Sequence, residues 1–441
     1  MPDTFDLILR GGTVVNHDGI GLRDIGIWGG RIAAIGALAQ ASAGETIDAT
    51  GLTILPGVID TQVHFREPGA THKEDLESGA RAAVLGGVTA VFEMPNTTPP
   101  TTTAEALADK VARATHRMAC DFSFWVGGTR DTLADIPELE QLPGSAGIKV
   151  FAGSSTGDLL VEDEATLSDI LSLTSRRVAF HSESEPRLRA RLGVRREGDP
   201  ASHSEWRDAE AALECTQMLV GLAEDARKPI HILHVSTAEE MVLLAQHKGL
   251  VSVEVTPQHL TLTAEEAYPR LGTRAQMNPP LRSAAHQRAV WQAVNDGVAD
   301  ILGSDHAPHT LEEKAKPYPN SPSGIPGVQT LLPIMLDHVA AGWLTLQRLV
   351  DMTSAGPQRL FGIAGKGRIA VGYDADFTVV DLAATRTIEG ARMASKSGWT
   401  PFDGRVVKGF PIGTIVRGRK VMWDGEVIGA AMGEPVRFVG A

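Results

Sequence analysis

Three polar residues that could do chemistry, Gln62, His64 and Arg66, alternate at the end of an apolar run in the segment 55–69. Every second side chain of an extended chain points the same way, so these three are predicted to share one face at the carboxyl end of a strand. In a parallel α/β barrel that end carries the active site. The alternative is a surface loop that happens to contain a His and an Arg.

Further polar residues follow other β-prone runs. Asp305 is the strongest candidate, as a metal ligand, as a general base on a metal-activated water, or as both. Imidazoles and carboxylates gathered at one barrel mouth would form a transition-metal site. His231, three residues before His234, is expected to be packed or to face the helices. The candidates at the other strand ends are Asn96 in EMPN, Lys149 in GIKVFAG, His181, His234, His259 in TPQH, and Asp305, His306 and His309 in SDHAPH.

Lys149 lies between Ile148 and Val150, where a charged, unpaired amine would be costly. Burial lowers the pKa of a lysine, and a neutral amine can react with carbon dioxide. The resulting carbamate is an anionic ligand that can bridge two metals. The alternative is an ion pair between Lys149 and an acid inside the barrel.

These residues need an α/β scaffold, and the sequence predicts one. Apolar β-prone runs alternate with helical patterns, which indicates parallel strands with right-handed crossovers and suggests a (β/α)₈ barrel. Polar stretches at 153–164, 183–204 and 310–327 are expected to be active-site loops. The eight predicted strands are 54–63, 88–94, 122–126, 147–152, 177–181, 230–235, 251–256 and 299–304.

Both ends of the chain have short β-prone runs separated by Gly-Gly and Asp-Gly pairs, which are typical of hairpins. We predict one small β-sandwich domain built from both termini, with residues 1–54 as its first part and residues 366–441 as its second. The barrel is then predicted to occupy residues 55–365. Two separate β subdomains are the alternative.

Composition narrows the range of partners. The net charge is −13 and no Lys/Arg-rich run stands out, which argues against nucleic acid or an anionic membrane as a partner. The start of the chain lacks the pattern of a signal peptide, and no apolar stretch is long enough to span a membrane. Cys120 and Cys215 are the only cysteines, which fits a reducing cytosol, so we expect a cytoplasmic protein.

The motifs together resemble the cyclic amidohydrolases of the amidohydrolase superfamily, and among them the dihydroorotases most closely. HFREPG, MPNT, IKVF, HSE, HVSTAE, TPQHL, MNPPLR and GSDHAPH occur in the order of that family and cover nearly the whole chain. The resemblance implies a barrel with a small β-sandwich. It also implies a zinc-dependent hydrolase that reversibly opens dihydroorotate to N-carbamoyl-aspartate in pyrimidine biosynthesis.

The resemblance implies a role for each site residue. His64 and Asp305 would bind the more buried metal, a carboxylated Lys149 would be the bridge, and His181 and His234 would hold the second metal. Asp305 would also take a proton from the attacking water and deliver it to the leaving amide nitrogen. The substrate is then a small anionic cyclic amide, and the residues implied to bind it are Arg66, Asn96 and His309 at its carboxylate and Asn278 at its ring amide.

One departure from the family pattern is Gln62, which stands where the family has the first His of His-x-His. An amide oxygen is a poorer zinc ligand than an imidazole and adds no charge. The chain could therefore bind one zinc ion, bind two with Gln62 or water filling the gap, or be a non-catalytic relative. Allantoinase is the nearest competing activity. A homo-oligomer, dimer or tetramer, and a transcarbamoylase partner are further expectations from the resemblance.

Overall fold

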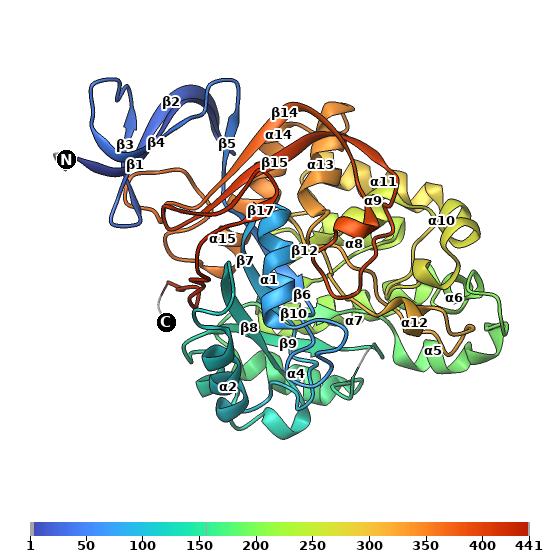
Figure 1. Cartoon of the computed structure of the whole chain (residues 1–441). Helices are drawn as coiled ribbons and strands as arrows, with labels where there is room; N and C mark the ends of the chain where they lie inside the picture. The colour runs from blue at the N-terminus through green and yellow to red at the C-terminus, as the bar shows by residue number, and fades with distance from the viewer. Residues whose placement is uncertain (1–3, 156, 440–441) are drawn as a thin grey trace.

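The computed structural model describes residues 4–155 and 157–439, and these form two sheets (Figure 1). One sheet has eight parallel strands in simple sequential order. Every residue of these strands is buried, as expected where helices cover the outside of a parallel sheet. The strands are β6 (Val58–Val63), β7 (Val88–Glu93), β8 (Asp121–Gly127), β9 (Ser145–Phe151), β10 (Val178–His181), β11 (Ile230–Ile232), β12 (Val251–Val255) and β13 (Ile301–Leu302).

The second sheet takes strands from both ends of the chain, as predicted. It has nine strands, mostly antiparallel, and it joins the two ends where β5 pairs with β14. The strands are β1 (Phe5–Asn16), β2 (Gly19–Trp28), β3 (Arg31–Gly36), β4 (Ala43–Asp48), β5 (Thr53–Pro56), β14 (Phe377–Thr387), β15 (Val406–Val416), β16 (Arg419–Trp423) and β17 (Glu426–Val427). The predicted fold class is therefore confirmed, while the domain bounds 1–54, 55–365 and 366–441 stay a prediction.

Helices follow most of the barrel strands and cover the barrel (Figure 1). Several begin at an Asp or Thr whose side chain accepts a backbone N–H of the first turn, as Asp208 does for α7. The α-helices are α1 (Leu76–Leu85), α2 (Ala104–Ala114), α3 (Ile136–Leu139), α4 (Glu164–Leu173), α5 (Glu185–Ala190), α6 (Ser202–Trp206), α7 (Ala209–Ala226), α8 (Ala238–Ala245), α9 (Pro257–Thr261), α10 (Ala264–Leu271), α11 (Ala284–Asn295), α12 (Leu311–Lys314), α13 (Leu331–Ala340), α14 (Leu346–Val350) and α15 (Gly356–Phe361). No helix of the described ranges is long and apolar enough to cross a membrane.

The predicted strand 54–63 is in fact two strands that belong to different sheets. Gly57 separates β5 from β6, and a Cβ atom built there would lie 2.2 Å from Thr89 Oγ1. Only a glycine leaves room for the chain to cross this closely from the second sheet into the barrel. The sequence pattern missed the break because both strands are apolar and buried.

Side chains complete the barrel where strand pairing is shortest. Strand β13 has two residues and pairs with β12, and the segment that follows it meets β6 through an isolated bridge between His306 and Val63. The buried Asp60 joins the two edges, because its Oδ1 accepts the backbone N–H of Ser304 at 3.0 Å and that of Gln62 at 3.3 Å. This closure fixes the ends of β6 and β13 relative to each other, and both ends carry predicted site residues.

Candidate active site

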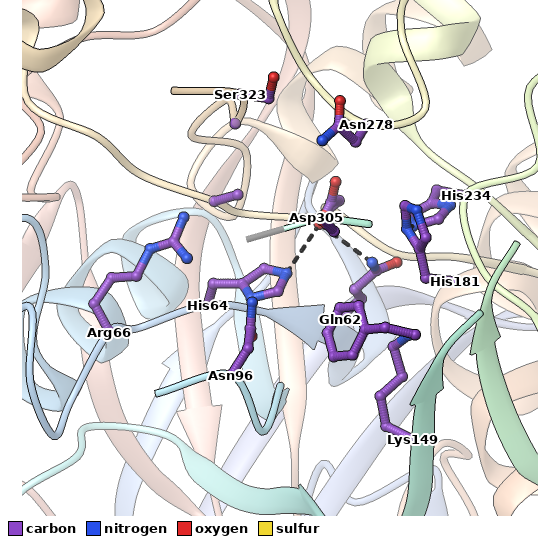
Figure 2. A pocket seen from close by; sticks show the side chains of 14 residues that line it. Gln62, His64, Arg66, Asn96, Lys149, His181, His234, Asn278, Asp305 and Ser323 are labelled. Carbon is purple, nitrogen blue, oxygen red and sulfur yellow. Dashed lines mark hydrogen bonds and ion pairs between the residues drawn. The ribbon is translucent and has the colours of Figure 1, made fainter. Parts of the chain in front are cut away.

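The carboxyl ends of the barrel strands enclose a cavity of about 400 Å³ (Figure 2). All of the predicted metal and substrate residues except His309 line it. Ser155 and Ser323 also line it, and they come from two of the three predicted loops. The sequence-predicted residues at the cavity, Gln62 included, are Gln62, His64, Arg66, Asn96, Lys149, His181, His234, Asn278 and Asp305.

On one side of the cavity, His64 and Gln62 both approach the same oxygen of Asp305 (Figure 2). Oδ1 of Asp305 lies 3.3 Å from His64 Nε2 and accepts a hydrogen bond from Gln62 Nε2 at 3.2 Å. His64 Nδ1 lies 2.9 Å from Asn96 Oδ1. Burial lowers the pKa of His64, so the ring is neutral and carries one N–H. This hydrogen is either on Nδ1, which then donates to Asn96, or on Nε2, which then donates to Asp305. If the hydrogen is on Nδ1, the lone pairs of His64 Nε2 and Asp305 Oδ1 face each other, an arrangement that a cation stabilises.

On the other side, His181 and His234 form a hydrogen-bonded pair of imidazoles, with His181 Nδ1 3.1 Å from His234 Nε2. His181 Nε2 donates to Glu183 Oε2 at 3.0 Å, since this carboxylate can only accept. Burial by itself would raise the pKa of Glu183. The positive charge of the buried Arg207 guanidinium opposes this effect most strongly, and the pKa is lowered to about 2. The second nitrogen of His181, Nδ1, is therefore a lone pair that accepts the Nε2–H of His234. This leaves His234 Nδ1 as the lone pair without a partner among the described residues. A carboxylate that holds an imidazole in this way is typical of metal-ligating histidines.

Lys149 is fully buried between these two sides. Burial holds its pKa well below the ordinary value of a lysine, which favours the neutral amine. Its Nζ donates to the Val150 carbonyl at 2.7 Å and lies 3.8 Å from the centre of the Phe151 ring. No carboxylate of the described residues forms an ion pair with it. Of the two alternatives for Lys149, the geometry favours the reactive neutral amine over the ion pair.

Three cavity residues have a backbone in the left-handed region, which side chains other than glycine rarely adopt. They are Arg66 at φ 62°, His234 at φ 41° and Asp305 at φ 42°. Such conformations cost about 1–3 kcal/mol each and occur mainly at functional sites. His234 follows the end of β11, so this turn aims it at the cavity, whereas His231 points into the barrel and donates or accepts at Ser252 Oγ, 2.8 Å away. His231 is packed, as expected, but it does not face the helices.

Arg66 brings a positive charge to the cavity. Its Nε donates to the Pro308 carbonyl at 3.3 Å, and burial lowers its pKa only to about 10, so it stays charged at neutral pH. His309 is outside the described lining of the cavity and lies behind Arg66, with its Nε2 3.4 Å from Arg66 Nη2 and 3.0 Å from the Ser323 carbonyl. Lys73 Nζ is 3.2 Å from the other ring nitrogen. Both nitrogens of His309 are thus occupied within the protein.

From the sequence we did not predict that Glu183 and Arg207 support His181. Glu183 is the last residue of the HSE motif, two residues after His181, so its place beside the imidazole could have been found from that spacing. Arg207 is 24 residues away from Glu183 and lies between α6 and α7. Nothing in the sequence signals this pairing, because a charged residue before a helix is ordinary.

The side chains present fit a metal ion. Within the described chain, no three His, Cys, Asp or Glu side chains gather into a complete set of ligands. The His181–His234 pair is short of one donor, which a carbamate on Lys149 would supply. The buried His234 Nδ1 and Gln62 Oε1 have no hydrogen-bond partner among the described residues. Figure 2 shows this Gln62 oxygen turned toward the side of His181.

An eight-stranded α/β barrel whose mouth combines imidazoles, a buried lysine and a carboxylate defines a hydrolase of the metal-dependent barrel class. Residues 53–421 match the amidohydrolase family, and the chain belongs to that family. The predicted resemblance and the predicted enzyme class are thereby confirmed. Membership implies a metal cofactor.

Relatives and solved structures agree with this assignment. The chain is 39% identical over 421 residues to a dihydroorotase of Halobacterium salinarum, covering 94% of this chain and 97% of the relative. It is 36% identical over 449 residues to an allantoinase of Rubrobacter xylanophilus, covering 98% of both chains. The structure is similar to the L-hydantoinase (dihydropyrimidinase) of Arthrobacter aurescens, with a TM-score of 0.94, 32% identity, and coverage of 98% of this chain and 99% of that chain.

Proposed function

We propose that this protein is a dihydroorotase, which reversibly hydrolyses the ring amide of L-dihydroorotate to give N-carbamoyl-L-aspartate. The observation that carries the proposal is the presence of a buried, charged Arg66 in the same cavity as Asp305 and the His181–His234 pair. An arginine can bind a carboxylate through two parallel hydrogen bonds, which supplies both charge and orientation. Dihydroorotate carries such a carboxylate on its ring. The relatives named as dihydroorotases support the same choice.

The cofactor that we propose is zinc, held by His181, His234 and a carbamate on Lys149. The lowered pKa of the buried Lys149 amine and its lack of an ion pair among the described residues support this modification, since only an unprotonated amine adds carbon dioxide. Zinc supplies an activated water and polarises a carbonyl oxygen. His64 and Asp305 would form a weaker second position, because Gln62 contributes no imidazole there.

Asp305 is the proposed general base and acid. It would take the proton of the attacking water and give it to the amide nitrogen as the ring opens, so that the proton is conserved over the reaction. The hydrogen bond from Gln62 and the approach of His64 fix the position of its carboxylate. On the other side of the cavity, Glu183 and Arg207 orient His181. Arg66, Asn96, His309 and Asn278 are proposed to bind the substrate, with His309 acting through its contact with Arg66.

Allantoin is the second candidate substrate, because an allantoinase matches the chain at 36% identity over 98% of its length. Allantoin is also a cyclic amide, but it carries a ureido group in place of the ring carboxylate. A charged Arg66 therefore favours dihydroorotate.

The homo-oligomer and the transcarbamoylase partner expected from the resemblance also stay predictions.

The test is steady-state hydrolysis of L-dihydroorotate, allantoin and hydantoin by protein that has been loaded with zinc or treated with a chelator. Zinc-dependent turnover with dihydroorotate preferred is the expected result. The Asp305→Asn variant is the control, and it should keep the fold and lose about 10²–10⁴-fold in kcat. If allantoin is turned over in preference, then allantoin, and not dihydroorotate, is the substrate. No turnover of any cyclic amide by metal-loaded protein would identify a non-catalytic relative.

A further inference from the structure

His203 is a buried histidine beside the cavity that the proposed reaction does not use. It lies in α6 and is only 2% exposed, and its ring packs edge-on against the rings of Trp206 and Tyr318. Its Nδ1 has no hydrogen-bond partner among the described residues, whereas its Nε2 faces several oxygen atoms. Those oxygens are Met277 O at 3.2 Å, Asn278 Oδ1 at 2.9 Å and Ser323 Oγ at 3.4 Å.

These contacts determine where the ring hydrogen of His203 lies. A backbone carbonyl such as Met277 O can only accept, so Nε2 carries the hydrogen and Nδ1 is the lone pair. The atom of Asn278 at 2.9 Å must then be the amide oxygen, which accepts from the same N–H. Figure 2 shows the Asn278 oxygen pointing away from Asp305. The NH₂ group of Asn278, which can only donate, is the polar group that this side chain presents to the cavity.

We infer that His203 is a positioning residue that fixes Asn278 as a hydrogen-bond donor to a carbonyl oxygen of the substrate ring. The inference rests on the proposed function and adds the ring atom that Asn278 recognises. The edge of a cyclic ureide alternates C=O acceptors with N–H donors. With its NH₂ group fixed toward the cavity, Asn278 binds the ring when a carbonyl oxygen faces it. A ring N–H at the same position finds no acceptor, so that orientation is disfavoured. This selects one orientation of the ring relative to Asp305.

The experiment compares His203→Gln with His203→Glu, which have the same shape and opposite hydrogen-bonding character. The amide NH₂ of Gln reaches the position of Nε2 and can still donate, so its KM for dihydroorotate should stay within about threefold of the unmodified value. The carboxylate of Glu can only accept, so Asn278 should turn its NH₂ toward it and present its oxygen to the substrate. KM should then rise roughly tenfold or more, with zinc content unchanged. Equal KM values for the two variants would overturn the inference.

Two further measurements separate positioning from general damage. In an Asn278→Ala background, His203→Glu should cause no additional rise in KM, whereas a merely structural defect would add to it. If the Glu variant does not fold, His203→Leu removes the donor without burying a charge, and KM should rise because nothing then fixes the Asn278 amide; an unchanged KM would overturn the inference. Histidine ¹⁵N NMR of the unmodified protein should show an Nε2–H tautomer for the signal that His203→Gln removes. An Nδ1–H signal would overturn the inference even if no cyclic amide is hydrolysed and the proposed function fails.

Discussion

At the scale of single residues, the two sides of the cavity differ in how well they can hold a cation. His181 is oriented by an ionised Glu183, and its partner His234 is also an imidazole. His64 faces Asp305, but its neighbour Gln62 already uses its amide N–H on the same Asp305 oxygen. One Gln in place of His thus turns a potential metal ligand into a hydrogen-bond donor to the carboxylate.

Arg66 is predicted to set the affinity for the substrate carboxylate. Replacing Arg66 with Met keeps much of its length and removes the charge, so KM for dihydroorotate should rise by about 10–100-fold, the value of a lost charge-assisted pair. Zinc content should not change, because Arg66 is not among the proposed ligands. Steady-state kinetics and metal analysis of the same preparation measure both quantities.

The matched control for Arg66→Met is Arg130→Met, since the Arg130 side chain is 72% exposed and, among the described residues, pairs only with Asp163 on the surface. It should leave KM unchanged. An Arg66→Met enzyme with unaltered KM would show that the carboxylate binds elsewhere in the cavity.

At the scale of elements, a buried ionic cluster connects the barrel to the second sheet. Lys366 Nζ lies 2.6 Å from Asp121 at the start of β8 and 2.5 Å from Asp376 just before β14. Arg417, which follows β15, pairs with the same Asp121. Lys366 and these two aspartates are almost fully buried, and the surrounding carboxylates raise the pKa of Lys366 above its ordinary value even though burial opposes this. The cluster lies at the amino end of β8, the end of the barrel opposite to the cavity.

Lys366→Met should therefore destabilise the protein without changing its chemistry. Removing the ammonium leaves the buried Asp376 without its ion-pair partner and leaves Asp121 with Arg417 alone. Breaking a buried ion pair typically costs about 3–5 kcal/mol of unfolding free energy. Urea denaturation measures this loss, and kcat of the folded protein should be unchanged.

Lys408→Met is the control for this variant, because Lys408 is exposed on β15. It should change the unfolding free energy by less than about 0.5 kcal/mol. Similar denaturation midpoints for the two variants would contradict a stabilising role of the cluster.

At the scale of the whole molecule, the number of metal ions per chain depends on the entire barrel mouth, since the proposed ligands lie in or just after five different strands, from β6 to β13. We expect about one tightly bound zinc ion per chain, because the side of His181 and His234 gains a full set of donors once Lys149 carries the proposed carbamate, whereas the side of His64 and Asp305 is left without a third ligand by Gln62. Gln62→His should raise this to about two, as it completes a second set with His64 and Asp305. Metal analysis after dialysis against zinc-free buffer gives the ratio.

Gln62→Leu is the matched control for metal number, because it removes the amide without adding a donor, and its zinc content should stay at about one per chain. A Gln62→His protein with unchanged zinc content would mean that residue 62 does not face a metal position.

The sequence by itself determined the fold class and predicted most of the polar residues that line the cavity. Strand ends can be recognised from apolar runs followed by polar residues, and parallel strands of a barrel bring all such ends to one mouth. That local pattern was enough to name His64, Lys149, His181, His234 and Asp305, which the structure brings to one cavity.

Only the tertiary structure decided the contacts between residues distant in sequence. It divides the predicted strand 54–63 at Gly57, places His309 behind Arg66, and pairs Glu183 with Arg207. It also sets which ring nitrogen of each imidazole carries the hydrogen. That depends on which acceptor from another strand or loop lies within reach, as the Met277 carbonyl does for His203. Such pairings arise from packing between elements, and a side chain's own neighbours in the sequence do not encode them.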